Sequence, residues 1–154
     1  MEIRRAELAD LAWLAAKLGP LPLFRRYGLT EKVLEERWTR ALGAGERLWV
    51  ALFDGAPQGL SWYLPSGTFA SGAYLRTLAV AQAAQGRGVG LGLLKAFEAA
   101  SRDAAGGCFL LTAEFNTAAQ KFYERHGYRQ VGKLPGFAMP EVTELIYWRR
   151  KESR

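Results

Sequence analysis

The sequence contains one cysteine and one histidine, and this scarcity excludes several kinds of site. Cys108 has no second cysteine with which to form an intramolecular disulfide. Cys108 and His126 are together too few for a structural zinc cluster, so we expect no metal site. The apolar run around Cys108 favours a buried packing residue over a nucleophile.

Long apolar runs are absent as well. No stretch approaches the roughly eighteen uninterrupted apolar residues of a membrane span, and residues 1–5 lack the apolar core of a signal peptide. We therefore expect a cytoplasmic protein with no membrane contact. A length of 154 residues with 49% hydrophobic and 23% charged residues is typical of a globular protein, so residues 1–154 are expected to form a single domain.

The net charge of +6 indicates an anionic partner without identifying it. A phosphate-bearing cofactor would be sufficient, and no recognisable motif favours DNA or RNA, so we expect no nucleic-acid partner. Part of the excess charge lies in the tail, where a solvated end is the simpler interpretation than a binding site. The tail residues concerned are Arg149, Arg150, Lys151 and Arg154.

Hydrophobic periodicity predicts a chain of mixed helices and strands. The predicted helices cover residues 7–18, 30–42, 89–104 and 117–126, and the predicted strands cover 48–53, 59–64, 73–80, 108–112, 128–132 and 143–148. Thr30 and Asn116 stand where N-cap residues are preferred. The strand–helix–strand order across 73–112 requires a parallel pair joined by a crossover. We therefore expect an α/β protein with a central mixed, twisted sheet flanked by helices.

The segment Gln85-Gly86-Arg87-Gly88-Val89-Gly90 lies just after a predicted strand and just before a predicted helix. Glycine permits unusual backbone dihedrals and close approach of a ligand, while the helix N-terminus favours negative charge. Arg87 could add a second contact to a phosphate. A nucleotide-triphosphatase loop would need Lys followed by Ser or Thr after Gly90, and Leu91-Gly92 stands there instead. A tight turn without a ligand is the alternative interpretation.

A second spaced set of residues lies in and around the helix predicted at 117–126: Asn116, Ala119, Phe122, Tyr123, Gly127 and Tyr128. Together, this set and residues 85–90 resemble the two signature segments of the GNAT superfamily of acetyl-CoA-dependent N-acetyltransferases. The first resembles the family's Gln/Arg-x-x-Gly-x-Gly/Ala loop, and the second resembles its Asn-x-x-Ala-x-x-(aromatic or Leu)-Tyr-x-x-x-Gly-(Phe or Tyr) segment. The strong part of the resemblance covers residues 73–132.

The resemblance implies an enzyme that transfers an acetyl group from acetyl-CoA to a primary amine of a small molecule or peptide. It implies a sheet splayed between the strands at 73–80 and 108–112, with the pantetheine arm of acetyl-CoA held there. The residues implied in cofactor binding are Leu78, Ala79 and Val80 through their backbone, then Gln85, Gly86, Arg87, Gly88, Val89 and Gly90, and finally Asn116 in addition to its cap role.

The resemblance implies fewer catalytic residues than cofactor-binding residues. It implies that Tyr123 is the general acid that protonates the departing thiolate, although the helical spacing of Tyr123 also fits a core aromatic. The family often places a general base on one of the two central strands, and no acidic residue stands there. Glu114, just after the strand at 108–112, is the nearest acidic candidate, and a solvated loop carboxylate or a water acting as base are equal alternatives.

The acceptor and the assembly are left open by the sequence. Phe24, Arg25, Tyr27 and Phe137 lie in weakly patterned segments that could line an acceptor pocket. The family often forms dimers, so a homodimer is a possibility. A non-catalytic coenzyme A-binding sensor and a nucleic-acid-binding module remain the competing hypotheses, and a turnover assay separates the enzyme from the sensor.

Overall fold

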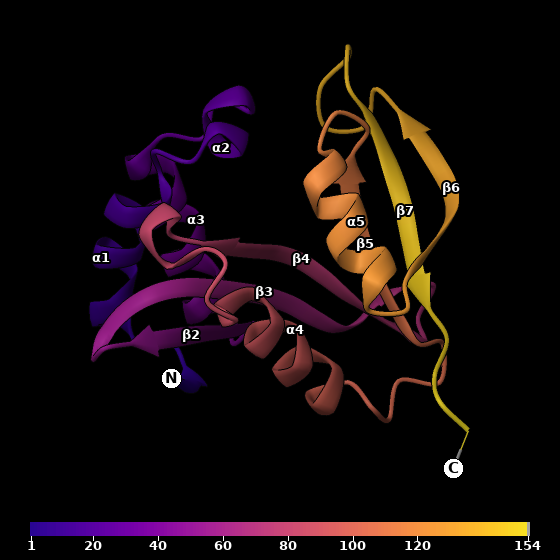
Figure 1. Ribbon diagram of the computed structural model, residues 1–154, viewed down its shortest axis with the longest axis horizontal. Helices are drawn as coiled ribbons and strands as arrows, with labels where there is room; N and C mark the ends of the chain where they lie inside the picture. Colours follow the sequence, from indigo (N-terminus) through magenta and orange to yellow (C-terminus); the bar gives the residue numbers. More distant parts are fainter. Residues whose placement is uncertain (154) are drawn as a thin grey trace. The chain divides into compact units, whose positions relative to one another are not determined.

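The computed structural model describes residues 1–153, and the chain divides into two compact units. The first unit comprises Met1–Leu64 and Thr77–Ala100, and the second comprises Pro65–Arg76 and Ser101–Arg154. Seven strands follow the order β1-β2-β3-β4-β5-β7-β6, which confirms the expected mixed sheet (Figure 1). None of the helices within residues 1–153 has the length and apolar character needed to cross a membrane.

The helices and strands follow the predicted order, with additions. The helices are α1 (Leu8–Leu18), α2 (Pro22–Arg26), α3 (Glu31–Gly43), α4 (Val89–Ala100) and α5 (Thr117–Arg125), with a 3-10 turn at Gln82–Ala84. The strands are β1 (Glu2–Arg5), β2 (Arg47–Phe53), β3 (Ala56–Thr68), β4 (Gly72–Val80), β5 (Cys108–Ala113), β6 (Arg129–Pro135) and β7 (Thr143–Arg149).

The first unit has helices on both faces of its strands. Leu48 and Val50 of β2 belong to a core cluster with α1 and α3, centred on the buried Trp38. Ala51 alternates with them and belongs to a second cluster with Leu93 of α4. The strand therefore fixes the position of α4, whose N-terminus follows the glycine-rich segment.

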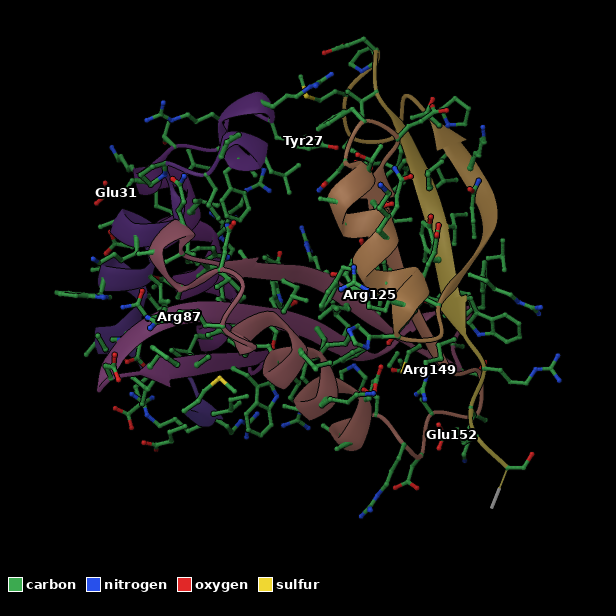
Figure 2. The ribbon with its side chains drawn as sticks, in the orientation of Figure 1. Tyr27, Glu31, Arg87, Arg125, Arg149 and Glu152 are labelled. Atoms are coloured by element: carbon green, nitrogen blue, oxygen red, sulfur yellow. The ribbon has the colours of Figure 1, made fainter. Side chains whose placement is uncertain are left out.

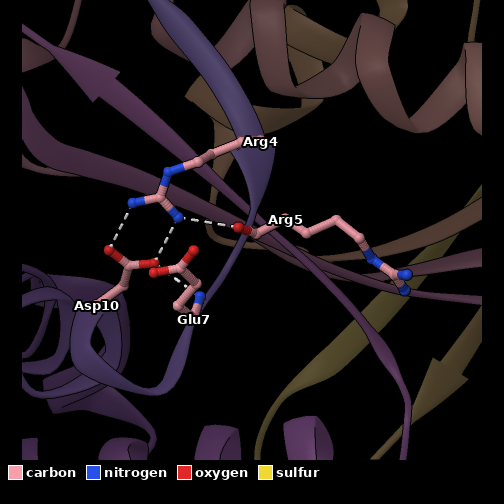
Figure 3. A network of polar contacts seen from close by, with 4 residues as sticks. All are labelled: Arg4, Arg5, Glu7 and Asp10. Atoms are coloured by element: carbon pink, nitrogen blue, oxygen red, sulfur yellow. Dashed lines mark hydrogen bonds and ion pairs between the residues drawn. The ribbon is translucent and has the colours of Figure 1, made fainter.

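The strand β1 is an addition to the predicted elements, and it is held to α1 by ionic contacts (Figure 3). Arg4 donates hydrogen bonds of 2.8 and 3.0 Å to the two carboxylate oxygens of Asp10, which also accepts from the backbone N–H of Glu7 at 2.7 Å. The Arg4 guanidinium is the main cause that lowers the pKa of Asp10 below its ordinary value. With four residues, three of them charged, β1 is too short and polar to show a strand pattern.

The second unit contains the parallel pair that the crossover required. Ala73, Tyr74 and Leu75 of β4 pair with Cys108, Phe109 and Leu110 of β5 in parallel, which confirms the prediction. The strand β7 pairs antiparallel with both β5 and β6. Cys108 is buried, as expected of a packing residue.

The helix α5 lies along β5 and β7 and defines one face of the second unit's strands (Figure 1). The Tyr147 hydroxyl of β7 donates to the Glu124 carboxylate of α5 at 2.8 Å, so Tyr147 points to the α5 side. Paired residues share a face, and neighbours along a strand alternate. We use "second face" for the opposite side, which carries Phe109 and Ala113 of β5 with their β7 partners Trp148 and Glu144.

The largest differences from the prediction concern three segments. The segment expected to be an irregular connector forms α2, which begins at Pro22, a favourable first helical residue. The helix α4 ends at Ala100 instead of residue 104, because Ser101–Asp103 forms a turn. The strand β3 extends from Ala56 to Thr68, well beyond residues 59–64. Each correction concerns local ends that tertiary pairing determines.

Candidate functional site

The glycine-rich segment forms an exposed turn at the start of α4 in the first unit. Gly86 and Gly88 have φ angles of +76° and +84°, and a Cβ atom built on either would meet nothing within 4 Å. Val89 is buried beneath them and anchors the helix. The first N–H groups of a helix have no intrahelical acceptor, so this turn presents backbone donors beside open space. That is the arrangement an anionic group requires.

A side-chain contact joins this turn to the end of β4. Gln85 Nε2 donates a hydrogen bond of 3.1 Å to the Val80 carbonyl oxygen, so two predicted donor-binding segments lie side by side. Arg87 (labelled in Figure 2) places its guanidinium 4.7 Å from the centre of the Phe53 ring. That contact holds the Arg87 guanidinium over the ring face, beside the turn. Gly90 lies inside α4, within its first turn.

The side chains at the end of β4 pack against the two core clusters of the first unit. Ala79 belongs to the core cluster of α1 and α3, whereas Leu78 and Val80 pack against the cluster of α4. Their side chains therefore have little freedom to contact a ligand, which favours a role for the backbone, as the sequence resemblance implies.

Two predicted residues lie on α5 in the second unit. Asn116 Oδ1 accepts a hydrogen bond of 3.2 Å from the Ala119 backbone N–H, which confirms the N-cap. Tyr123 is 8% exposed and makes edge-to-face contacts with Phe122 and Tyr128 at 5.2 and 5.7 Å between ring centroids. Burial raises the pKa of Tyr123 above the ordinary tyrosine value, so its phenol remains protonated at neutral pH.

The remaining predicted residues of the second unit are exposed. Glu114 lies just beyond β5 with its carboxylate 3.6 Å from Lys133 Nζ, and both side chains are more than half exposed. Phe137, in the loop between β6 and β7, is 65% exposed. Their proposed roles stay predictions.

The predicted acceptor residues of the first unit lie on and beside α2. Phe24 is buried and packs edge-to-face on Trp38 at 6.4 Å, so its ring stabilises the core. Arg25 is exposed and lines a pocket of about 330 Å³ that extends to Glu31 at the start of α3. Tyr27 follows α2 directly and is half-buried (Figure 2).

The sequence interpretation passed over a buried acid on β7. Glu144 is 7% exposed, although it lies in a strand of mostly apolar residues. The sequence does contain one signal for this residue, because an acid within an apolar strand is unusual. Its neighbours on β4 and β5 cannot be read from the sequence, since they depend on the register of the strands.

The comparisons with known proteins identify the family. Residues 8–128 match the family described as the acetyltransferase (GNAT) family. The chain belongs to the GNAT family. The expected resemblance is confirmed, and the protein is an acetyltransferase of a family that uses acetyl-CoA. No curated protein matches the sequence.

Solved GNAT structures share the fold across the whole chain. An N-acetyltransferase from Staphylococcus aureus Mu50 is 14% identical with a TM-score of 0.79, covering 98% of each chain. A ribosomal-protein-alanine N-acetyltransferase from Brucella melitensis is 21% identical with a TM-score of 0.74, covering 97% of this chain and 99% of that one. An aminoglycoside 6'-N-acetyltransferase complexed with coenzyme A is 17% identical with a TM-score of 0.77, covering 100% and 99%. The likeness shows the fold.

Proposed function

We propose that this protein transfers the acetyl group of acetyl-CoA to a primary amine of a small molecule or peptide. The observation that carries the proposal is the exposed turn before α4, where Gly86 and Gly88 adopt positive φ beside open space and Gln85 is bonded to Val80. Similar structures are named as N-acetyltransferases of a ribosomal-protein alanine and of an aminoglycoside, which supports an amine acceptor.

The residues of the turn fit the pyrophosphate of the donor. Backbone N–H groups at the start of α4, together with Arg87, would hold the phosphates. The backbone of Leu78, Ala79 and Val80 would hold the pantetheine arm, because the side chains of these residues are engaged in the core. Asn116 would contribute from the N-terminus of α5.

The proposed reaction is direct attack of a neutral amine on the thioester carbonyl. Backbone N–H groups near Val80 would stabilise the oxyanion, and holding the two substrates together supplies much of the rate enhancement. Tyr123 would protonate the leaving sulfur, since burial keeps its phenol in the protonated form. The reaction requires no acyl-enzyme.

Calorimetry with coenzyme A and a thiol-release assay with acetyl-CoA test the proposal. The assay uses a panel of single amines: spermidine, kanamycin, free amino acids and a peptide with an N-terminal alanine. We expect binding of coenzyme A and thiol release that requires one of these amines. A protein that binds coenzyme A and releases no thiol with any amine would be a sensor instead of an enzyme.

A further inference from the structure

The buried carboxylate of Glu144 has no part in the machinery described so far. It lies on the second face, paired in register with Ala113 at the end of β5, and is 7% exposed. Burying a carboxylate costs free energy unless positive charge or hydrogen bonds compensate it. Such residues are therefore concentrated at functional sites, where a substrate or a proton uses the charge.

Two residues of β4 share this face with Glu144. Tyr74 pairs with Phe109, and Phe109 pairs with Trp148, so all three side chains are on the second face. Alternation along β4 places Arg76 on the same face as Tyr74. Tyr74, Arg76 and Glu144 all belong to the second unit, on strands that β5 joins. We call these three residues the β4–β7 polar group.

The charges of this group act on one another. Burial raises the pKa of the Tyr74 phenol, the Arg76 guanidinium lowers it, and the Glu144 carboxylate raises it. The phenol is therefore close enough to be affected by both charges. The group combines a buried carboxylate, a half-buried hydroxyl and an exposed guanidinium. This agrees with the register, which puts the three side chains on one side of the strands.

We propose that Glu144 binds the ammonium group of the acceptor and takes a proton from it, with the Tyr74 hydroxyl holding the resulting amine. The proposal rests on the proposed function, and it supplies the base that the sequence did not identify. Glu114 is a poorer candidate because its carboxylate is 56% exposed and pairs with Lys133. Arg76 lies on the same face, and its positive charge acts on the Tyr74 phenol in the opposite sense to that of Glu144.

The proton balance of the step is complete. The R–NH₃⁺ form of the acceptor gives one proton to Glu144, and the nitrogen lone pair then forms a bond to the acetyl carbonyl carbon. The carbon–sulfur bond breaks, and the sulfur takes a proton from Tyr123. The acetylated nitrogen loses its remaining extra proton to solvent, Tyr123 takes a proton back from solvent, and Glu144 releases its proton to solvent. The products are R–NH–COCH₃, coenzyme A thiol and one proton.

The test compares Glu144→Gln with two matched variants, Glu141→Gln in the exposed loop before β7 and Glu114→Gln beyond β5. The probe is the amine of the panel above that the unchanged protein acetylates fastest. We expect kcat/KM for this amine to fall about 100- to 10,000-fold in Glu144→Gln, the usual contribution of a general base. The loss should diminish as pH rises toward the pKa of the amine in solution, because a larger fraction of the amine then binds already deprotonated and needs no base.

Coenzyme A binding and thermal unfolding are measured on each variant to separate a structural effect from a catalytic one. We expect Glu144→Gln to bind coenzyme A like the unchanged protein, and Glu141→Gln to keep its rate and pH profile. Glu114→Gln tests the alternative base. If Glu144→Gln does not fold, Glu144→Asp retains the charge one methylene further from the acceptor and should lower kcat/KM by at least about tenfold.

Three outcomes would overturn the assignment of Glu144. These are a Glu144→Gln variant with an unchanged rate and pH profile, a Glu144→Asp variant with full activity, and a loss of the pH dependence in Glu114→Gln instead. An unchanged protein that turns over no amine would contradict the proposed function itself. An active protein with an active Glu144→Gln variant contradicts the role of Glu144 alone.

Discussion

The turn before α4 and the β4–β7 polar group differ in the part of the chain that would contact a ligand, which is the backbone in the turn and the side chains in the polar group. The turn offers backbone N–H groups and open space, and its glycines serve by having no side chain. The polar group depends on three charged or hydroxyl side chains from two strands that are distant in sequence. A donor whose phosphates are invariant suits a backbone site, whereas an acceptor that differs between enzymes suits a site made of replaceable side chains.

Because of this difference, substitutions in the two regions should act in different ways. Under the proposals above, changing a side chain of the polar group should alter the chemistry and leave the strands in place. Adding a side chain to the turn should block the ligand and also strain the backbone, since L-residues with a Cβ disfavour positive φ. Substitutions in the two regions should therefore give effects of different kinds, which can be measured.

The largest effect is expected from Gly88→Glu, which should abolish coenzyme A binding. A side chain there would occupy the open space beside the turn, and its negative charge would repel phosphate. We expect affinity to fall at least about 100-fold, equivalent to roughly 2.7 kcal/mol, in calorimetry.

Gly45→Glu is the matched control for this change. Gly45 also has a positive φ of 77° and nothing within 4 Å of its Cβ position, but it lies in the turn after α3. Both variants should lose about 1–2 kcal/mol of stability through backbone strain, and coenzyme A binding should be lost in Gly88→Glu alone. Normal binding by a folded Gly88→Glu protein would show that the turn is not the donor site.

Tyr123→Phe should give the next largest effect, on turnover without an effect on binding. The change removes the phenolic oxygen and keeps the ring that packs on Phe122 and Tyr128. A general acid is typically worth about 100- to 10,000-fold in kcat, so a loss of that order is expected in steady-state assays. Because burial raises the pKa of Tyr123, ionisation of this residue should cause no loss of activity up to about pH 10.

Tyr147→Phe serves as the comparison for Tyr123. Its hydroxyl donates to Glu124 and packs under α5, so its removal should cost about 1 kcal/mol of stability and leave kcat unchanged. Equal kcat for Tyr123→Phe and the unchanged protein, with chemistry shown to be rate-limiting, would return Tyr123 to a packing role and leave the proton to a water.

The segments that we assign to the donor could be recognised in the sequence because their patterns are local. The alternating glycines before a helix, the Asn116 cap and the spacing of Tyr123 all lie within short segments whose pattern is visible without a structure. The cap at Asn116 and the parallel β4–β5 pair are confirmed by the structure. The roles in binding and catalysis remain predictions.

The residues that we propose for the acceptor could not be predicted in the same way, because their arrangement is not local in sequence. Glu144 meets β4 only through the register of β7 on β5, and a slip of one residue would turn it to the α5 side. Phe24 shows the converse problem. Its position in an apolar and basic segment resembles a pocket lining, but the fold of α2 directs its ring onto Trp38 in the core.

The two N-cap residues, one in each unit, allow a comparison in which the expected effects are smaller. Thr30 accepts a hydrogen bond from the Val33 N–H at 3.3 Å, and Asn116 accepts one from the Ala119 N–H at 3.2 Å. Replacement of either by alanine should cost about 1 kcal/mol in urea unfolding. Asn116→Ala should in addition weaken coenzyme A binding several-fold, by about 1 kcal/mol, if its side chain also contacts the donor. Identical coenzyme A affinities in the two variants would reduce Asn116 to a cap.

The smallest effect is expected from Arg25→Ala, which tests whether the pocket beside α2 contributes to acceptor binding. Arg25 and Glu31 are the charged residues of its lining, and an exposed charge contributes about 0.2–1 kcal/mol to binding a group of opposite sign. The Michaelis constant for an acceptor carrying a carboxylate should therefore rise by up to about fivefold, with that for acetyl-CoA unchanged. Phe24→Ala is unsuitable for this test, because loss of its buried ring would cost about 3–5 kcal/mol of stability.

Arg37→Ala is the matched control, since Arg37 is an exposed arginine of the same unit that does not line the pocket. Both variants remove one positive charge from a protein of net charge +6, so any effect of total charge on an anionic acceptor should be equal in the two. A rise in the acceptor constant that is larger in Arg25→Ala assigns the effect to the pocket. A change confined to the acetyl-CoA constant, or one equal in both variants, would mean that the pocket beside α2 does not contribute to acceptor recognition.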